Sequence, residues 1–415
     1  MQVLVTSPIP THPQNHGNRA RVYSLCRTLQ QRGYKVHFVY GGLEGVSPEQ
    51  ELAMRATWDH VYIVPYEQKR RKQSKRTHHL IDDWYVPAVT EITQRILKVW
   101  DIDYCLANYV WFSRWLLDVP AGIPKYLDTH DMFANRNKNM KKDGLSAKWY
   151  STTPAEEAKA LNRADVVLAI QSSEAAVFQK ITKTQVATLG HYIPPNFLSA
   201  PDATPDSAPD KKQGSSNNRK LKVGYLASNN PINQHSLHKL VQELPHHPHL
   251  LDTVSLHLAG AICGCDVAQD SPFEKRGFVD KLETFYEEMD IILNPNLGGT
   301  GLKIKSVEAL SYGKPLVATY DAMIGIETSE KDHLHKTLNS LLEGLSDLAG
   351  NPSAVEALVL NGRVVFTRYS KAQKHTLDEI FPEKTRADSE QASGQAKTQA
   401  GGKSGEKSGG QGEIA

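Results

Sequence analysis

The sequence predicts an α/β protein made of two doubly wound domains that face each other across a cleft. The same order of strand, loop, helix and strand appears near residue 2 and again near residue 221. A polar segment at 199–220 separates the two occurrences. The length of 415 residues is sufficient for two domains of ordinary size.

The first domain begins with the apolar run at 2–6, which has the length of a strand. A loop follows, and apolar residues at 22, 25, 26 and 29 then recur at the spacing of a helix that ends at Gly33. Residues 35–40 (KVHFVY) form the next expected strand. A strand, a crossover helix and a second strand predict a right-handed parallel unit.

The second domain repeats this order. Residues 221–228 (LKVGYLAS) are an expected strand, a polar loop leads into a helical stretch at 235–244, and 254–260 (VSLHLAG) is the next strand. Ligands of such sheets bind outside the carboxyl ends of the strands. The expected site therefore lies in the cleft between the two domains.

Composition predicts the domain boundaries. Residues 199–220 are rich in Pro, Asp, Ser and Asn and nearly free of large apolar residues, which is typical of a linker. The predicted domains are therefore residues 1–198 and 221–366. A final helix is expected at 367–382, and 383–415, rich in Gly, Ser, Gln and Lys, is expected to be a disordered tail.

Charge and composition exclude several classes of function. The formal net charge of +2 provides no bulk electrostatic case for binding nucleic acid. No apolar run reaches the roughly eighteen residues of a membrane-spanning helix, and the N-terminus lacks the pattern of a signal peptide. The 4 cysteines are not grouped as zinc ligands, so reduced thiols in a cytoplasmic protein are expected.

A glycine-rich stretch at 294–319, NPNLGGTGLKIKSVEALSYGKPLVAT, carries the main functional signal. Its glycines let backbone N–H groups turn toward a ligand, and the N-terminus of the helix expected next attracts anions. Two lysines add positive charge, and a glutamate is suited to hydrogen bonds with a diol. The residues concerned are Gly298, Gly299, Gly301, Lys303, Lys305 and Glu308.

This order of parts predicts a site for a phosphate attached to a hydroxylated ring, such as a nucleotide or a sugar phosphate. The stretch is neither a P-loop nor a dinucleotide-binding fingerprint. Its spacing by itself fits a structural tight turn before an ordinary helix equally well.

The stretch resembles the donor-binding motif of the retaining GT-B glycosyltransferases of the group 1, or family 4, type. Further blocks follow the order found in that family and, with the glycine stretch, span most of residues 1 to 320. They are the opening strand, loop and helix at 7–40, YLDTHDMFANRNK at 126–138, ADVVLAIQSSEAAVF at 164–178 and GFVDKLETFYEEMDIILNP at 277–295.

The resemblance implies a GT-B fold of two Rossmann-like domains, an N-terminal acceptor domain and a C-terminal nucleotide-sugar-binding domain. It implies that the final helix crosses back to the N-terminal domain. It also implies transfer of a hexosyl or related sugar from a nucleotide-activated donor to a saccharide or lipid-linked acceptor, with retention, without a metal and without a cofactor beyond the nucleotide-sugar substrate. The implied pathway is the synthesis of cell-surface polysaccharide or glycoconjugate.

The resemblance assigns most donor contacts to the glycine stretch. Backbone amides and one lysine would stabilise the charge that develops on the leaving diphosphate. Lys303 is the favoured lysine because it lies nearest the amides, and the other is expected to face solvent. Glu308 matches the ribose-binding glutamate. The amides are those of Gly299, Thr300, Gly301 and Leu302.

In the N-terminal domain, His130 matches a residue that contacts the donor sugar, with hydrogen-bonded structure as the alternative. Asp131 is a further candidate contact, and Arg136 is expected near the diphosphate or the acceptor, or at a solvated helix start. Gly17 and Arg19 lie in the first loop, which faces the cleft. A plain turn glycine is the alternative for Gly17.

Two departures from the family pattern keep other functions open. Thr300 stands where many family members have a glutamate, and the segment SNNPINQ at 228–234 lacks the family's basic pair. A non-catalytic sugar-nucleotide-binding subunit is one alternative. A sugar-nucleotide epimerase or a phosphorylase-like enzyme on the same double fold is another.

The run KRRKQSKR at 69–76 is strongly basic. A solvated loop is the usual meaning of such a run. Contact with an anionic membrane surface is the alternative, which would make the protein peripheral on the inner face of a membrane. Nearby aromatic residues suit either an acceptor groove or core packing. They are Trp84, Tyr85, Trp111, Phe112 and Trp115.

Overall fold

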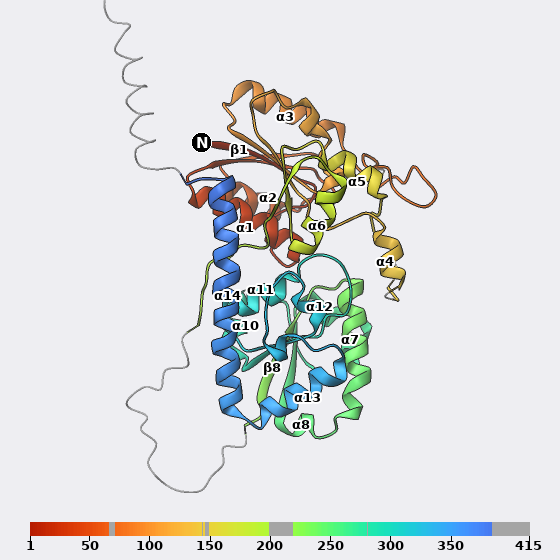
Figure 1. Cartoon of the computed structure of the whole chain (residues 1–415), viewed down its shortest axis with the longest axis vertical. Coiled ribbons are helices and arrows are strands. Elements are labelled where there is room, and N and C mark those ends of the chain that lie inside the picture. Colours follow the sequence, from red (N-terminus) through yellow and green to blue (C-terminus); the bar gives the residue numbers. More distant parts are fainter. Residues whose placement is uncertain (66–70, 143, 146–148, 199–218, 280, 384–415) are drawn as a thin grey trace, which may run out of the picture.

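The computed structural model describes residues 1–65, 71–142, 144–145, 149–198, 219–279 and 281–383. Two α/β domains are stacked along the long axis of the molecule, and one long helix, α14, runs beside both of them (Figure 1). Nearly all of the predicted linker at 199–220 and of the predicted tail at 383–415 lies outside the described residues, as does the start of the basic run at 69–76.

The N-terminal domain is built on a seven-stranded parallel sheet with the order β3-β2-β1-β4-β5-β6-β7. The winding changes direction between β1 and β4, which creates a topological switch point there. The strands are β1 (Gln2–Ser7), β2 (Lys35–Tyr40), β3 (His60–Ile63), β4 (Tyr104–Asn108), β5 (Lys125–Asp128), β6 (Val166–Ala169) and β7 (Gln185–Thr188). The helices are α1 (Gly17–Gln31), α2 (Pro48–Thr57), α3 (Pro87–Val99), α4 (Arg136–Lys142), α5 (Pro154–Leu161) and α6 (Ser172–Ile181).

The C-terminal domain has a five-stranded parallel sheet with the order β10-β9-β8-β11-β12 and its switch point between β8 and β11. Its strands are β8 (Leu221–Leu226), β9 (Val254–Ala259), β10 (Glu274–Gly277), β11 (Ile291–Asn294) and β12 (Leu316–Ala318). Its helices are α7 (Pro231–Glu243), α8 (Leu250–Thr253), α9 (Asp266–Gln269), α10 (Leu282–Glu288), α11 (Ile304–Ser311), α12 (Tyr320–Met323), α13 (Leu338–Ala349) and α14 (Pro352–Ile380).

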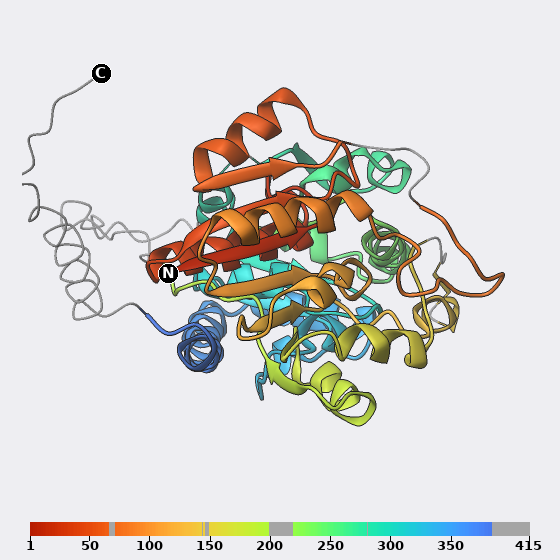
Figure 2. The same ribbon diagram turned by 90° about the horizontal axis from the view of Figure 1, so that it is seen from above.

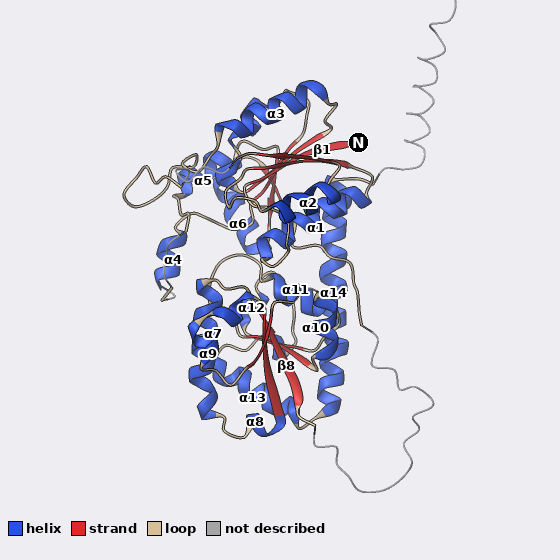
Figure 3. Cartoon of the chain, turned by 180° about the vertical axis from the view of Figure 1, so that it is seen from behind, coloured by secondary structure: helices blue, strands red, loops and turns tan. Residues whose placement is uncertain are grey.

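Helices cover both faces of each sheet (Figure 3), so the central strands are buried on both sides and consist almost entirely of apolar residues. The aromatic residues near the basic run mostly belong to this core. Trp84, Trp111, Phe112 and Trp115 are buried, and Trp111 and Trp115 are fully so. Core packing is therefore the correct interpretation for these four.

Helix α14 is longer than the final helix expected at 367–382, because it begins at Pro352 and continues for 29 residues. The side chain of Asn351 caps it by accepting from the N–H of Ala354, and proline fits the first helical position. Seen from above, α14 stands beside the N-terminal sheet and is viewed nearly end-on (Figure 2). Among the described helices, none is both long and apolar enough to cross a membrane.

The C-terminal end of α14 is anchored in the N-terminal domain. The guanidinium of Arg32 donates to the carbonyl oxygen of Phe381 at 2.8 Å and to the carboxylate of Asp378 at 2.6 Å. The Phe381 side chain is fully buried and packs against Tyr34 and Tyr126. The end of this helix therefore contributes core and hydrogen-bond partners to a domain that lies far away in sequence.

Truncating the chain before Thr367 is expected to destabilise the N-terminal domain, because it removes the buried Phe381 and leaves Arg32 without its acceptors. Loss of a buried aromatic side chain alone costs about 3–5 kcal/mol. The measurement is urea unfolding followed by tryptophan fluorescence, and the matched control ends after Glu383. Equal midpoints for the two truncations would contradict the structural role of the helix end.

Candidate functional site

A cavity of about 570 Å³ lies between the two domains. Loops that follow the strands at both switch points line it, as expected for doubly wound sheets. The N-terminal domain contributes His16, Gly17, Asn18, Arg21, Glu44, Tyr109, His130, Asp131, Phe133, Arg136, Met140, Trp149 and Ile170. The C-terminal domain contributes residues 225–233, Asn294, Asn296 and residues 300–305.

Three helix N-termini meet at this cavity. Helix α1 begins at Gly17, α7 at Pro231 and α11 at Ile304, and all three residues line the cavity. The residues before α1 and α11, His16 and Lys303, make no side-chain cap, so backbone N–H groups there stay available for a ligand. A Cβ at position 17 would lie 3.3 Å from the side chain of Ile304, so glycine permits the close approach of the two helices. Converging helix N-termini favour an anion.

The glycine loop of the C-terminal domain, residues 298–303, forms one wall of the cavity. Its glycines at 298, 299 and 301 have φ values of 66°, 77° and 78°, which L side chains rarely adopt. The N–H of Gly298 donates to Asp321 at 2.6 Å, and the N–H of Gly301 donates to Glu174 at 3.1 Å. Two loop amides are thus already bonded to carboxyl groups, one of them from the other domain.

Lys303 directs its ammonium group back onto the loop. Its Nζ donates to the carbonyl oxygens of Gly299, Thr300 and Gly301 at 3.2, 3.4 and 3.2 Å. An ammonium group has three N–H donors, so these contacts occupy all of them. Burial lowers the pKa of Lys303, and nearby carboxylates oppose this effect.

Lys305 lies in the first turn of α11, and its Nζ donates to Glu308 at 2.7 Å. The expectation that one of the two lysines faces solvent is wrong, since both line the cavity. Lys303 precedes the helix as its N-cap, so helical spacing does not separate the two side chains. Glu308 is buried and also accepts from the hydroxyl of Tyr286 at 3.4 Å, and it does not itself line the cavity.

His130 stands at the end of β5 with a φ of 62° and stacks on the ring of Tyr109 at 4.1 Å. Asn108 donates its amide N–H to the carbonyl oxygen of Thr6, which fixes its Oδ1 as the acceptor for Nε2 of His130 at 2.8 Å. Burial lowers the pKa of His130 to about 4, so the ring is neutral at neutral pH. A neutral ring protonated at Nε2 presents Nδ1 as a hydrogen-bond acceptor.

A buried ion pair between Arg21 and Asp128 lies next to the His130 ring. Nε of Arg21 lies 2.9 Å from Oδ2 of Asp128, and the same Asp128 oxygen is 3.2 Å from Nε2 of His130. Arg21 and Asp128 are 2% and 0% exposed. Arg21 also lines the cavity, so this ion pair connects the cavity wall to His130, the residue predicted to contact the donor sugar.

The other predicted N-terminal residues take different positions. Asp131 and Arg136 pair at 3.0 Å, and both line the cavity. Arg19 instead pairs with Glu44 at 2.6 Å, and of these two only Glu44 lines the cavity. In the glycine loop, Gly299 does not line the cavity either, and a Cβ at this position would lie 2.7 Å from the side chain of Ile232.

Comparison with known families gives a match for the segment of the C-terminal domain that carries the glycine loop. Residues 220–351 match the family model described as Glycosyl transferases group 1. We refer to these matched residues as the group 1 domain. No sequence among the curated proteins matches the chain.

Solved structures similar to the whole chain confirm the predicted GT-B fold around this group 1 domain. HepE from Anabaena, in complex with UDP and glucose, has a TM-score of 0.61 and 12% identity, covering 92% of this chain and 99% of HepE. Sucrose-phosphate synthase from Thermosynechococcus elongatus has a TM-score of 0.63 and 15% identity, covering 96% and 99%. A mutant of TarM from S. aureus, in complex with fondaparinux, α-GlcNAc-glycerol and UDP, has a TM-score of 0.57 and 9% identity, covering 95% and 99%. These identities show the fold alone, while the family match supports a glycosyltransferase that uses a nucleotide sugar.

Several residues around the group 1 domain were not predicted from sequence. A basic residue four positions after Gly17, on the same face of the expected helix, was an available signal for Arg21. Tyr109 and Glu44 follow strands β4 and β2, and this position alone is weak evidence that a residue lines the cavity. Glu174 offers no signal at all, because an acidic residue in the first turn of a helix is ordinary.

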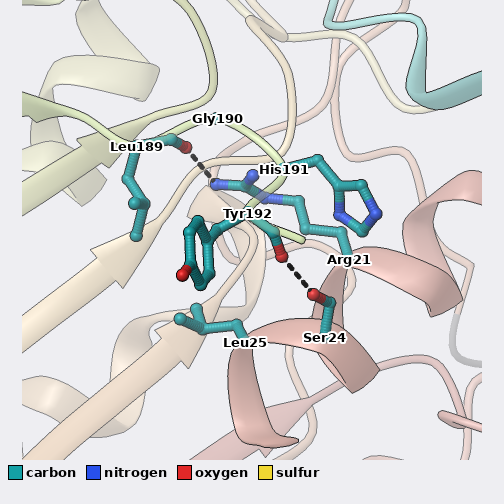
Figure 4. A pocket seen from close by; sticks show the side chains of 7 residues that line it. All are labelled: Arg21, Ser24, Leu25, Leu189, Gly190, His191 and Tyr192. Carbon is teal, nitrogen blue, oxygen red and sulfur yellow. Dashed lines mark hydrogen bonds between the residues drawn. The ribbon is translucent and has the colours of Figure 1, made fainter. Parts of the chain in front are cut away.

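A small cavity of about 10 Å³ lies behind Arg21, where the segment 189–192 crosses α1 (Figure 4). Arg21 donates to the backbone carbonyl oxygen of Leu189 at 2.8 Å, and the hydroxyl of Ser24 donates to the backbone carbonyl oxygen of Tyr192. The volume suits about one water molecule. All of the residues that line this small cavity belong to the N-terminal domain, and the large cavity beside the group 1 domain remains the candidate active site.

Proposed function

We propose that this protein is a glycosyltransferase that transfers a sugar from a nucleoside-diphosphate donor to a saccharide or lipid-linked acceptor. The observation that carries the proposal is the convergence of three helix N-termini and two lysines on one cavity bordered by the group 1 domain. Such a site stabilises the negative charge that grows on the leaving diphosphate. The proposed context is the synthesis of cell-surface polysaccharide or glycoconjugate.

The proposed reaction retains the anomeric configuration and uses no metal. In the proposed arrangement, Nδ1 of His130 accepts a hydrogen bond from a hydroxyl of the donor sugar, because Nε2 already donates to Asn108. A ring with a pKa near 4 is a poor general base at neutral pH, so the acceptor proton passes to the departing phosphate instead. Lys305 remains near that phosphate to neutralise its charge.

The acceptor is proposed to enter between α4 and the C-terminal domain. Phe133, Met140 and Trp149 line this part of the cavity and offer apolar and aromatic surface to a sugar ring or a lipid. Helix α4 extends from the N-terminal domain toward the C-terminal domain, on the side of the molecule opposite to α14 (Figures 1 and 3).

Donor binding tests the proposal directly. Thermal unfolding is measured with UDP, GDP and ADP, and then with sugar conjugates of the nucleotide that stabilises. UDP comes first because the HepE and TarM structures contain it. Release of the nucleoside diphosphate that depends on an added acceptor, with an α product from an α donor by NMR, supports the proposal.

Other outcomes of the donor assay point to the alternatives. Binding without transfer to any acceptor indicates a non-catalytic subunit, and interconversion of sugar nucleotides without an acceptor indicates an epimerase. Failure of every nucleotide to bind would contradict the proposed site.

Peripheral contact with an anionic membrane is proposed for the basic loop. Residues 71–76 are exposed, and the guanidinium of Arg71 stacks over Trp149, which lines the cavity. Replacing Lys72, Lys75 and Arg76 by serine is expected to weaken binding to phosphatidylglycerol vesicles about a hundredfold, at about 1 kcal/mol per basic residue.

Vesicle cosedimentation checks this membrane prediction. The matched control replaces three exposed lysines elsewhere on the same domain, Lys98, Lys180 and Lys183, by serine. Similar losses in both variants would indicate nonspecific charge attraction, and no wild-type binding would refute the membrane contact.

A further inference from the structure

A buried hydrogen bond joins the glycine loop to the N-terminal domain. The N–H of Gly301, in the glycine loop, donates to Oε1 of Glu174 at 3.1 Å across a separation of 127 residues. Glu174 lies in the first turn of α6, and Gln171 at the N-cap of that helix donates to the same oxygen at 3.1 Å. The glycine loop is therefore held by a carboxyl group that belongs to the opposite domain.

This contact is buried and tightly packed. Glu174 is 3% exposed and Gln171 is 4% exposed. A Cβ at Gly325 would lie 3.0 Å from the side chains of both Gln171 and Leu302, so the start of α6 presses closely against the C-terminal domain. The other oxygen of Glu174, Oε2, is buried without a hydrogen-bond partner among the described residues. A buried, half-bonded carboxyl group is costly for stability, and no step of the proposed reaction uses it.

We propose that Glu174 is an interdomain positioning residue, which holds the glycine loop in place as a wall of the donor cavity and couples that loop to closure of the two domains. Gly301 is the point of coupling, because its amide bonds to Glu174 and its carbonyl oxygen accepts from Lys303. Breaking the bond releases the loop from the N-terminal domain. An effect of this change on donor affinity rests on the proposed function, whereas the loss of order in the loop does not.

We call the hydrogen bond between Gly301 and Glu174 the latch, and the charged groups around Glu174 make it sensitive to pH. Asp131, from the loop after β5, and Glu157, from α5, face it within the N-terminal domain, and Lys303 faces it from the glycine loop. Burial and the charge of Asp131 raise the pKa of Glu174 to about 8. The neutral acid still accepts from Gly301 through its carbonyl oxygen, while ionisation places a third negative charge beside Asp131 and Glu157.

The sign of the pH effect follows from the raised pKa. A folded-state pKa above the unfolded value means that the native protein holds the proton more tightly. The contribution of Glu174 to stability is therefore fully present below the unfolded pKa of about 4.5 and is lost as the pH rises toward about 8. Glu174→Gln imitates the neutral acid and removes this part of the decline.

Hydrogen exchange of the ligand-free protein tests the latch. In Glu174→Ala, the amides of a peptide covering 298–303 are expected to exchange about tenfold faster than in wild type, the equivalent of losing one hydrogen bond. In Glu174→Gln, an acceptor oxygen remains, and protection is expected to return to within about twofold of wild type. The matched control is Glu157→Gln, a buried carboxyl whose hydrogen-bond donors among the described residues are Phe133 and Ala134 of its own domain.

Two results would overturn the proposal. One is unchanged protection of 298–303 in Glu174→Ala, or a gain in exchange equal to that caused by Glu157→Gln. The other is thermal unfolding from pH 5 to 9 in which Glu174→Gln loses as much stability as wild type, a measurement that holds even if the alanine variant fails to fold. A latch confirmed by exchange in a protein that binds no nucleotide would refute the proposed function and leave the latch intact.

Discussion

Replacing Lys305 by alanine is expected to lower kcat by about a hundred- to a thousandfold, the usual loss when one preorganised charge donor is removed. Lys305 lines the cavity and donates to a single described acceptor, Glu308. Two of its N–H groups therefore remain available for the phosphate oxygen on which charge develops. Single-turnover transfer with saturating donor measures this loss, provided that thermal unfolding shows the variant to be folded.

Lys303→Ala is the comparison variant, and a different result is expected from it. The Lys303 ammonium is fully occupied by three carbonyl oxygens of the glycine loop. Its removal should mainly loosen the loop, which raises the donor KM and lowers the unfolding temperature. The sequence favoured Lys303 as the charge donor because of its position next to the amides, whereas the hydrogen bonds of the two ammonium groups lead us to propose Lys305. Turnover like wild type in both variants would contradict a diphosphate site at this loop.

Replacing Arg21 by methionine is expected to lower the free energy of unfolding by about 3–5 kcal/mol, because it leaves the charge of Asp128 buried without its partner. Arg21 and Asp128 are almost completely inaccessible to solvent, and the nearest approach of their side chains is 2.5 Å. Methionine preserves most of the side-chain volume, so loss of packing contributes little. Urea unfolding at pH 7 measures the change.

Two further variants separate charge from packing in the Arg21 experiment. The double variant Arg21→Met with Asp128→Asn leaves no unpaired charge and should recover more than half of the lost stability. Arg55→Met breaks an ion pair with Glu51 that is about half exposed, and its effect should stay within about 0.5 kcal/mol. A small loss in Arg21→Met, or no recovery in the double variant, would show that the ion pair does not support this part of the cavity.

Local patterns in the sequence were sufficient to predict both doubly wound sheets. A parallel sheet that is buried on both faces needs short apolar strands, and residues 2–6 and 221–228 have that composition. The glycine loop was also visible, because positive φ values restrict positions 298, 299 and 301 to glycine. Gly17 was placed near the cleft because its loop follows the first strand, whereas His130 was placed there by the family resemblance of the block around it, and both residues line the cavity.

The tertiary structure alone decided which groups those residues meet. Glu174 reaches Gly301 across 127 residues, and Arg21 reaches Asp128 across 107. Periodicity shows which face of an element is buried, but it carries no information about the residue of another element that covers it. The orientation of the Lys303 side chain and the burial of Glu308 could not be predicted for the same reason. Both depend on where α11 begins and on what packs against it. The sequence was therefore sufficient to predict which residue types form the site. Its hydrogen bonds and ion pairs depend on the tertiary structure, because they join residues that come together only when the chain folds.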